Sequence, residues 1–474
     1  MLTLSLIIEA LTGILPKGFD REIHGVAIDS RMVRPGSMFV ALPGERVDGH
    51  EFVQEAFNRG ASVALVHQDL PFECFQYDLR EGGLSEDRTE IEDDSVCLRV
   101  DDSLQAMQKI AGFYRRQQDI RVIGITGSVG KSTTKELVAE VLNQRYNTLK
   151  SPGNLNNEIG LPLTLLNLTN QHERSVLEMG FYVPGEIEFL CDLAKPQIGV
   201  ITNIGTVHAE RAGSIDEIAR GKAELVNALP PAPEGLAILN YDDPRVKKMA
   251  EQTEARVFFY GTGQEADLWA DNIEGLGLDG IRFRLHYSNE SIHLKVPLIG
   301  RHSVHTALRA AAVGLNDGLT WQEIVDGLQT GRAQLRLVAV RANSGALLLD
   351  DTYNASPEST MAALNLLEDL DGRKVAVLGD MLELGQYEQQ GHQMVGSRAA
   401  EVANELITVG ERAKLIAFAA SEAGMARKNI QEFDTSEQAV EFLAQHLTPQ
   451  DVVLVKGSRG MQMELIVNEL ESVK

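Results

Sequence analysis

The chain has 474 residues with 43% apolar content, so its length predicts about three domains around separate cores. A formal net charge of −24 excludes a general role on nucleic acid or on an anionic membrane surface, because both repel an acidic protein. No run of 18 apolar residues occurs, and the three cysteines have unrelated spacings. We therefore expect no membrane insertion, no disulfide framework and a cytoplasmic location.

The first segment, residues 1–115, mixes short strand and helix patterns. The apolar stretch 2–15 contains Glu9 and has no basic leader, which favours a helix packed on a core over a secretory signal. The acidic stretch 77–94 has few apolar residues and is expected to be a solvated excursion.

In the second segment, residues 116–330, continuous apolar runs alternate with helical patterns. Continuous runs separated by helices predict a buried, mostly parallel sheet. The predicted strands are 122–126, 175–179, 199–203 and 236–240.

A glycine-rich turn follows the first of these strands and leads directly into a helical pattern. Backbone N–H groups near Gly127 and Gly130, together with a helix N-terminus, form a cradle for phosphate oxygens. Lys131 is suited to reach the β- and γ-phosphates, and the Ser132 hydroxyl to ligate Mg²⁺. The strict phosphate-loop motif has glycine where this chain has Ile125. The turn 127–133 nevertheless predicts a nucleoside triphosphate site rather than an ordinary turn, and its residues are Gly127, Ser128, Val129, Gly130, Lys131, Ser132 and Thr133.

Polar residues stand at the carboxyl ends of the next strands, where ligands gather in an open parallel sheet. Glu178 ends one strand and is placed to hold Mg²⁺. Asn203 ends another, and His208 follows five residues later as a candidate ligand for a second cation. A hydrogen-bonded loop histidine is the alternative for His208.

Lys222 lies in the apolar stripe of the helix that opens at Ser214. A lysine there either extends its ammonium to solvent or loses its charge, since a buried charge is costly. A neutral amine can add CO₂ to give an anionic carbamate that ligates a metal. The helical pattern alone favours the first alternative.

Asn154, Asn156 and Asn157 lie in a loop that follows Ser-Pro-Gly at 151–153. Amides clustered in such a loop bind sugar hydroxyls or phosphates, or else form turns.

The third segment, residues 331–474, is predicted to be a second open α/β layer. Its predicted strands are 346–350, 375–378, 405–409 and 452–455. Asp351 and Asn354 follow the first, and Lys456 and Arg459 follow the last. The segment 379–385 (GDMLELG) follows the second. The two cations suit an anionic substrate or phosphate. Three polar strand ends in one layer suggest an active site in the cleft between this layer and the nucleotide domain.

Together these motifs resemble the Mur ligases over nearly the whole chain. The segments that carry the resemblance are 29–31 (DSR), 36–44, 48–50 (DGH), 127–133, 154–160 (NLNNEIG), 177–180 (LEMG), 300–302 (GRH), 350–355 (DDTYNA), 379–385 (GDMLELG) and 456–459 (KGSR). The forms at 156–160 and 350–355 are more specific to the family branch that adds D-alanyl-D-alanine than to its sisters.

The resemblance implies an α/β fold of three domains. These are a small UDP-sugar-binding domain (1–115), a central P-loop ATPase-like parallel-sheet domain (116–330) and a C-terminal Rossmann-like domain (331–474). It implies an ATP-dependent, ADP-forming ligase that joins UDP-N-acetylmuramoyl-tripeptide to D-alanyl-D-alanine through an acyl phosphate, for peptidoglycan synthesis. ATP, two Mg²⁺ ions and a monomer without a nucleic-acid partner are expected.

The resemblance also implies roles for single residues. Ser132 and Glu178 match ligands of one Mg²⁺, and His208 and carbamoylated Lys222 match ligands of the other. The nucleotide-facing residues of the third domain are Asp351 and Asn354. Arg336 matches a linker arginine expected to act in catalysis. Residues matched to substrate binding are Ser30, Arg31, Asn154, Asn156, Asn157, Lys456 and Arg459.

The chain departs from the family at two positions after Gly300-Arg301-His302. Ser303 and Thr306 stand where asparagines are usual, and the second of these asparagines usually lies against adenine. Three alternatives remain: a sister ligase adding a single amino acid, a folylpolyglutamate synthase-like ligase, and a P-loop switch that performs no ligation.

Overall fold

The computed structural model describes residues 1–16, 20–44, 47–80, 95–330 and 338–472. They fall into two compact units. The first holds Met1–Gly124, Tyr146–Gly180 and Glu186–Ile198, and the second holds Ile125–Arg145, Phe181–Gly185 and Gly199–Lys474. The described part of the chain has no helix with the length and apolar character needed to cross a bilayer.

The N-terminal sheet is five-stranded and parallel, in the order β1-β2-β3-β5-β4. Its strands β2, β3 and β5 are mostly apolar and buried, as expected inside a parallel sheet covered by helices, whereas the edge strand β4 has one buried residue, Tyr77. The strands are β1 (Val26–Ala27), β2 (Met38–Val40), β3 (Val63–Val66), β4 (Gln76–Asp78) and β5 (Val96–Arg99), and the helices are α1 (Leu4–Thr12), α2 (Val53–Asn58) and α3 (Ser103–Arg116). The predicted excursion at 77–94 lies largely outside the described residues.

The central sheet has nine strands in the order β14-β13-β12-β11-β10-β9-β6-β8-β7. The strands predicted in this segment are confirmed within two residues as β6 (Arg121–Thr126), β8 (Arg174–Glu178), β9 (Ile198–Ile201) and β10 (Leu236–Asn240). The sequence analysis did not identify β7 (Thr148–Lys150), β11 (Arg256–Gly261), β12 (Leu268–Gly275), β13 (Ile281–Tyr287) and β14 (Glu290–Val296). The last three form an antiparallel meander whose residues alternate between buried and exposed, so a continuous apolar run is missing there.

Eight helices are described along this central segment. They are α4 (Lys131–Leu142), α5 (Gly160–Leu165), α6 (Glu186–Ala194), α7 (Ala209–Ala212), α8 (Ile215–Asn227), α9 (Pro244–Lys248), α10 (Val304–Asn316) and α11 (Trp321–Gln329). Helix α8 begins directly after Ser214, where the sequence predicted its start, and the Ser214 side chain caps it by accepting from the Glu217 N–H (3.2 Å).

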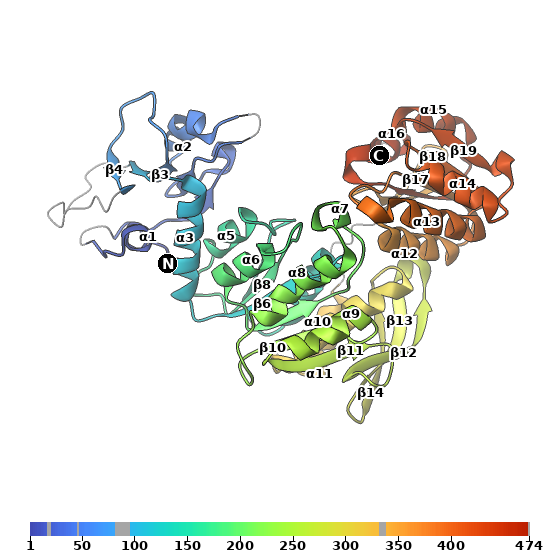
Figure 1. The fold of residues 1–474 in the computed structure, drawn as a ribbon, viewed down its shortest axis with the longest axis horizontal. Coiled ribbons are helices and arrows are strands. Elements are labelled where there is room, and N and C mark those ends of the chain that lie inside the picture. Colours follow the sequence, from blue (N-terminus) through green and yellow to red (C-terminus); the bar gives the residue numbers. More distant parts are fainter. Residues whose placement is uncertain (17–19, 45–46, 81–94, 331–337, 473–474) are drawn as a thin grey trace. The chain divides into compact units, whose positions relative to one another are not determined.

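The C-terminal sheet has six strands in the order β15-β16-β20-β17-β18-β19, parallel except for β15. Its strands are β15 (Val338–Arg341), β16 (Leu347–Asp351), β17 (Arg373–Gly379), β18 (Glu405–Val409), β19 (Ile430–Phe433) and β20 (Asp451–Lys456). One face packs on α12 (Pro357–Glu368), α13 (Glu388–Val402) and α14 (Lys414–Glu422), and the other on α15 (Ser436–His446) and α16 (Glu464–Leu470) (Figure 1). The predicted Rossmann-like layer is thereby confirmed.

Candidate active site

The phosphate-loop candidate lies between β6 and the first turn of α4. Gly127 has φ +146°, and a Cβ there would lie 1.8 Å from the Thr202 hydroxyl oxygen, so only glycine fits. Gly130, with φ +83°, leads directly into α4. The loop is held from beneath by Asn203, whose backbone and side-chain oxygens accept from the N–H groups of Ser128 (3.0 Å) and Val129 (2.9 Å).

Lys131, the first residue of α4, reaches back over this loop. Its ammonium donates to the carbonyl oxygens of Gly127 (2.8 Å) and Ser128 (3.4 Å). The positive end of the α4 dipole and a lysine therefore meet at one place, which is the arrangement that phosphate binding requires.

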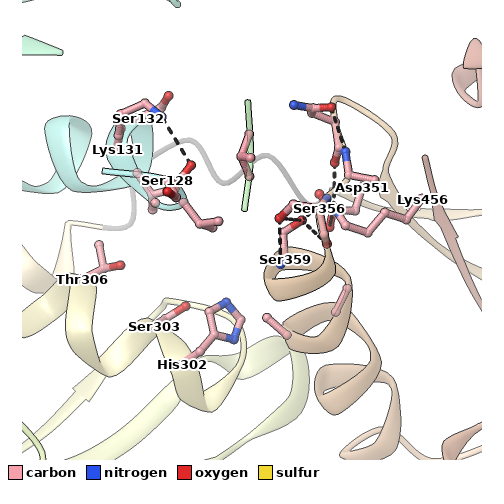
Figure 2. Close-up of a pocket in the computed structure, with 18 of the residues that line it drawn as sticks. Ser128, Lys131, Ser132, His302, Ser303, Thr306, Asp351, Ser356, Ser359 and Lys456 are labelled. Carbon is pink, nitrogen blue, oxygen red and sulfur yellow. Dashed lines mark hydrogen bonds and ion pairs between the residues drawn. The ribbon is translucent and has the colours of Figure 1, made fainter. Parts of the chain in front are cut away.

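A pocket opens beside the loop, and Figure 2 shows side chains from three places pointing toward it. The loop contributes residues 128–133, and the start of α10 contributes His302, Ser303 and Thr306. The third wall consists of Asp351, Asn354 and Lys456 together with the first turns of α12. The structure thus brings the predicted ATP residues of the second and third segments to one pocket.

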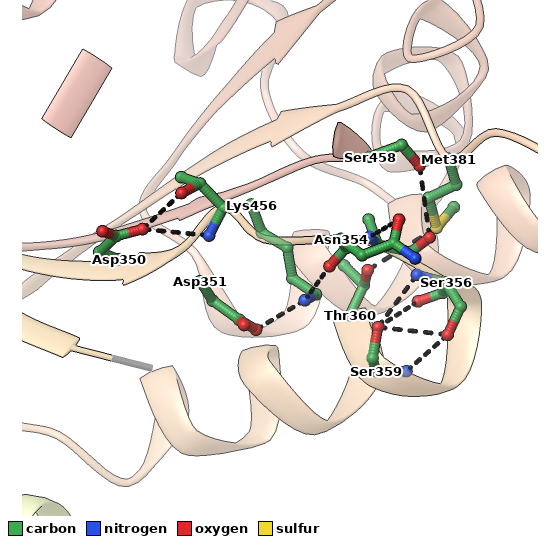
Figure 3. A network of polar contacts seen from close by, with 11 residues as sticks. Asp350, Asp351, Asn354, Ser356, Ser359, Thr360, Met381, Lys456 and Ser458 are labelled. Carbon is green, nitrogen blue, oxygen red and sulfur yellow. Dashed lines mark hydrogen bonds and ion pairs between the residues drawn. The ribbon is translucent and has the colours of Figure 1, made fainter. Parts of the chain in front are cut away.

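Lys456 and Asp351 form the polar centre of the third wall (Figure 3). The Lys456 side chain is 2% exposed and its ammonium donates to Asp351 Oδ2 (2.6 Å) and to the Asn354 carbonyl (2.8 Å). Arg459 is exposed and is not among the residues that line the pocket. The charge of Lys456 is therefore neutralised by Asp351. Lys456, at the end of β20, and Arg459 do not act as one cationic cluster.

His208 is held by a carboxylate of the C-terminal layer. Its Nδ1 lies 2.7 Å from Glu383 Oε2, and its ring packs edge-to-face on Tyr182 with centroids 4.7 Å apart. Burial lowers the pKa of His208, the positive charge of Lys131 lowers it further, and the hydrogen bond with Glu383 opposes both. A neutral imidazole whose Nδ1 is engaged presents Nε2 to a metal.

Lys222 is buried on α8, as its place in the apolar stripe predicted, with 1% of the residue exposed. Its ammonium nitrogen lies 4.6 Å from the centroid of the Phe181 ring, and its charge also depresses the pKa of His208. The first alternative, an ammonium extended to solvent, is therefore wrong.

Glu178 ends β8 as predicted and is 1% exposed. Its Oε1 accepts from the Asn156 side-chain amide (2.9 Å). Its Oε2 is buried and has no hydrogen-bond partner among the residues that the structure describes. A buried carboxylate oxygen of this kind has the chemistry of a Mg²⁺ ligand.

The remaining candidates lie in the first unit or outside the described residues. Asn157 Oδ1 accepts from the Gly160 N–H (2.9 Å) and so has a structural role at the start of α5, whereas Asn154 is exposed. Ser30 donates to Glu55 (3.1 Å), and Arg31 is exposed beside Asp29 (2.6 Å). Arg336 lies outside the described residues.

Two acidic residues at this site were not identified from the sequence. Glu383 lies in a motif that was noted, but nothing in the pattern indicated that it holds His208. Glu358 reads as an ordinary first-turn acid of α12, yet its Oε1 accepts from the N–H (3.1 Å) and the hydroxyl (3.3 Å) of Thr206. Both roles depend on contacts between segments more than 150 residues apart.

The donor set fits Mg²⁺ bound together with a nucleotide. Among the described residues, no three acids, histidines or cysteines converge into a site that would hold a metal by themselves. Mg²⁺ usually takes one or two carboxylates and completes its shell with phosphate oxygens and water. In the first unit, the buried Glu178 oxygen is a carboxylate ligand of this kind. In the second unit, the pocket beside Lys131 is where phosphate oxygens would lie.

Comparison with known proteins places these features in a family. Residues 22–115 match "Mur ligase family, catalytic domain", residues 125–314 the "Mur ligase middle domain" and residues 331–459 "Mur ligase, glutamate ligase domain". The UDP-N-acetylmuramoyl-tripeptide–D-alanyl-D-alanine ligase of Bacillus subtilis (strain 168) is 34% identical, over 99% of this chain and 98% of that protein.

Solved structures agree over the full length. Crystal structure I of MurF from Acinetobacter baumannii has 32% identity and a TM-score of 0.81, with 98% of both chains covered. The MurF ligase of Thermotoga maritima in complex with ADP has 26% identity and a TM-score of 0.77, with 97% of both chains covered.

The phosphate loop follows the carboxyl end of β6 and faces a pocket that a second α/β layer completes. This arrangement defines an ATP-dependent enzyme of the P-loop class. With the three matched domains and full-length relatives, the chain belongs to the Mur ligase family. It is an ATP-dependent, ADP-forming ligase.

Proposed function

We propose that this ligase joins D-alanyl-D-alanine to UDP-N-acetylmuramoyl-tripeptide and so forms the pentapeptide precursor of peptidoglycan. The observation that carries the proposal is the pocket in which Lys131 and Ser132 face Asp351, Asn354 and Lys456. Its support is the full-length similarity to ligases named for this reaction. From the cysteine usage we further propose a cytoplasmic location, and from the family resemblance a monomer.

The chemistry follows from the weakness of a carboxylate as an acyl donor. The terminal carboxylate of the tripeptide attacks the γ-phosphate of ATP, so that an acyl phosphate forms and ADP leaves. The free amine of D-alanyl-D-alanine then attacks the acyl carbon, and inorganic phosphate leaves with both electrons of the broken bond. The amine loses its proton as the amide forms. Lys131 stabilises charge on the β- and γ-phosphates during the first step.

Other side chains hold the substrates. Ser30 and Arg31 are proposed for the UDP-sugar, and Asn154, Asn156 and Asn157 for its peptide arm. Asn156 also orients Glu178 through their 2.9 Å hydrogen bond. Arg336 is proposed as a phosphate contact, and Arg459 as a contact to the incoming dipeptide.

Two Mg²⁺ ions are proposed, one with Ser132 and Glu178 and one with His208 and a carbamate on Lys222. Bound there, they would neutralise the charge that repels a carboxylate from a triphosphate. Glu383 fixes the His208 ring by its contact with Nδ1. Burial of Lys222 disfavours its charged form and so favours the neutral amine from which a carbamate forms, whereas the contact with the Phe181 ring favours the ammonium.

The product mass tests the proposal. The protein is incubated with ATP, Mg²⁺, UDP-N-acetylmuramoyl-tripeptide and D-alanyl-D-alanine, and the product is weighed by mass spectrometry. We expect the pentapeptide mass and phosphate release that depends on the dipeptide. Phosphate release with a single amino acid in its place, or with a folate acceptor, would assign the chain to a sister activity. ATP hydrolysis at the same rate with or without each acceptor would indicate a P-loop switch that performs no ligation.

A further inference from the structure

Arg309 is a buried arginine on α10 whose contacts all lie around the phosphate loop. The residue is 5% exposed. Its guanidinium donates to the hydroxyls of Thr134 (2.9 Å), Thr306 (2.8 Å) and Tyr260 (3.2 Å). These hydroxyls come from α4, α10 and β11, so one side chain ties three elements together.

Each branch of this network leads back to the loop or its pocket. The Thr134 hydroxyl donates to the Gly130 carbonyl (2.6 Å), and a Cβ on Gly130 would lie 3.2 Å from Arg309 Nη2. Tyr260 donates to the Thr202 carbonyl (3.0 Å), and the Thr202 hydroxyl donates to the Val129 carbonyl (2.7 Å). Thr306 itself lines the pocket. The guanidinium therefore lies directly behind the phosphate-binding turn.

The charge of Arg309 has no acidic partner in the described part of the chain, because its three acceptors are neutral hydroxyls. Arg373 and Arg145, by contrast, pair with Asp451 (2.6 Å) and Glu323 (2.6 Å). A buried cation without a carboxylate is costly, and an anion brought close to it recovers part of that cost. The phosphates of a nucleotide on the loop are such an anion.

We propose that Arg309 supplies fixed positive charge to the phosphate loop from behind and thereby determines the affinity for nucleoside di- and triphosphates. This inference rests on the ATP-dependent activity described above. Arg309 is a positioning residue, because it acts through Gly130 and Thr134 rather than by touching the phosphates. Its effect grows with the number of phosphates, since Coulomb attraction scales with ligand charge.

Two variants separate charge from packing. Arg309→Gln removes the charge and keeps hydrogen-bond donors, whereas Arg309→Lys keeps the charge and loses the planar fork. Arg115→Gln is the matched control, since Arg115 is 4% exposed and donates to main-chain carbonyls such as Ala194 (2.8 Å), and neither residue is among those that line the pocket. Thermal unfolding of each variant reports its stability.

Calorimetric affinities for a non-hydrolysable ATP analogue, ADP and AMP provide the readout. We expect Arg309→Gln to weaken the triphosphate roughly tenfold, ADP less and AMP least, with Arg309→Lys close to the parent. We expect Arg115→Gln to show no such gradation. Equal losses for all three nucleotides, or none, would overturn the inference and leave Arg309 a packing residue.

Two further outcomes are distinguishable. If the parent protein binds none of the nucleotides, the activity itself is wrong rather than the role of Arg309. If Arg309→Gln does not fold, Arg309→Met replaces it, because this change also removes the charge and fills much of the same buried space with an apolar side chain. A twofold or larger loss for the triphosphate with unchanged AMP affinity supports the inference, and unchanged triphosphate affinity contradicts it.

Discussion

Lys456 and Asp351 are direct neighbours across two parallel strands, and their side chains form an ion pair of 2.6 Å in the nucleotide pocket. Both strands end at this point, so the pair is the last rung of the β16–β20 ladder. This ion pair restrains the Asp351 carboxylate, which lines the pocket. The ion pair thus orients the residue proposed to face the nucleotide.

Replacing Asp351 with asparagine should destabilise the protein by about 3 kcal/mol, because it leaves the 2%-exposed Lys456 side chain charged and unpaired. The free energy of unfolding in urea measures the loss. The double variant Asp351→Asn/Lys456→Met should recover much of it, since the buried charge is gone. A double variant as unstable as the single one would show that the pair contributes by packing alone.

Lys131→Ala should lower ATP turnover by about 100-fold or more while the protein stays folded. Alanine is a good helix former at the start of α4, and the lost ammonium is the group proposed to stabilise the phosphates. Dipeptide-dependent phosphate release gives the rate, and circular dichroism reports the fold. Lys248→Ala, an exposed lysine at the end of α9, is the control and should leave the rate unchanged. Parent-like kinetics for Lys131→Ala would contradict the loop assignment.

The N-terminal layer should show an acid-dependent loss of stability at Asp48. The backbone N–H of His50 donates to this carboxylate (2.9 Å), as does the Gln68 amide, and together they hold its pKa at about 2. A carboxyl whose pKa is depressed by folding stabilises the protein above its ordinary value near 3.8, and this contribution is lost as the pH falls toward 2.

The measurement compares thermal midpoints of the parent and Asp48→Asn at pH 6 and pH 3. We expect the variant to be less stable by about 1 kcal/mol at pH 6, with a smaller gap at pH 3 because the parent begins to lose the interaction. The exposed Asp371 serves as the control through Asp371→Asn, which should change neither midpoint appreciably. A stability difference between parent and variant that is larger at pH 3 than at pH 6 would contradict the lowered pKa of Asp48.

Local patterns in the sequence predicted much of this molecule. The apolar run 122–126, the glycines after it and the helical pattern from Lys131 predict a strand, a turn and a helix in succession. The structure has all three at these positions. The place of Lys222 in the apolar stripe of α8 followed from the spacing of its neighbours, but that pattern favoured an ammonium extended to solvent, and the structure buries the side chain instead. These features depend on residues close in sequence, which is why periodicity and turn chemistry reveal them.

Contacts between distant segments could not be predicted in this way. Asp351 and Lys456 were assigned to different ligands, because their pairing depends on the register of two strands and the residues are 105 positions apart in the sequence. The meander β12–β14 was missed, since its half-exposed strands lack a continuous apolar run. Arg309 reads in the sequence as one polar residue in an alanine-rich helix, and only the packing of α10 on α4 shows that it lies behind the loop.

Lys222→Ala should abolish ligation, and a short carboxylate such as acetate, or excess bicarbonate, should restore part of it. The proposed carbamate is an anionic ligand built on a neutral amine, and a small carboxylate in the space left by the truncated side chain offers similar oxygens. Lys222→Arg should also be inactive, because a guanidinium stays protonated and does not form a carbamate.

The matched control for this rescue is Lys135→Ala. Lys135 is as deeply buried as Lys222, at 1% exposure, but its ammonium pairs with Glu136 (3.1 Å). Whatever rate that variant has, acetate should not raise it, because no carboxylate is missing there. Rescue of both variants would indicate a general salt effect. A Lys222→Ala enzyme with parent activity would show that the second metal, if it binds, needs no ligand from α8.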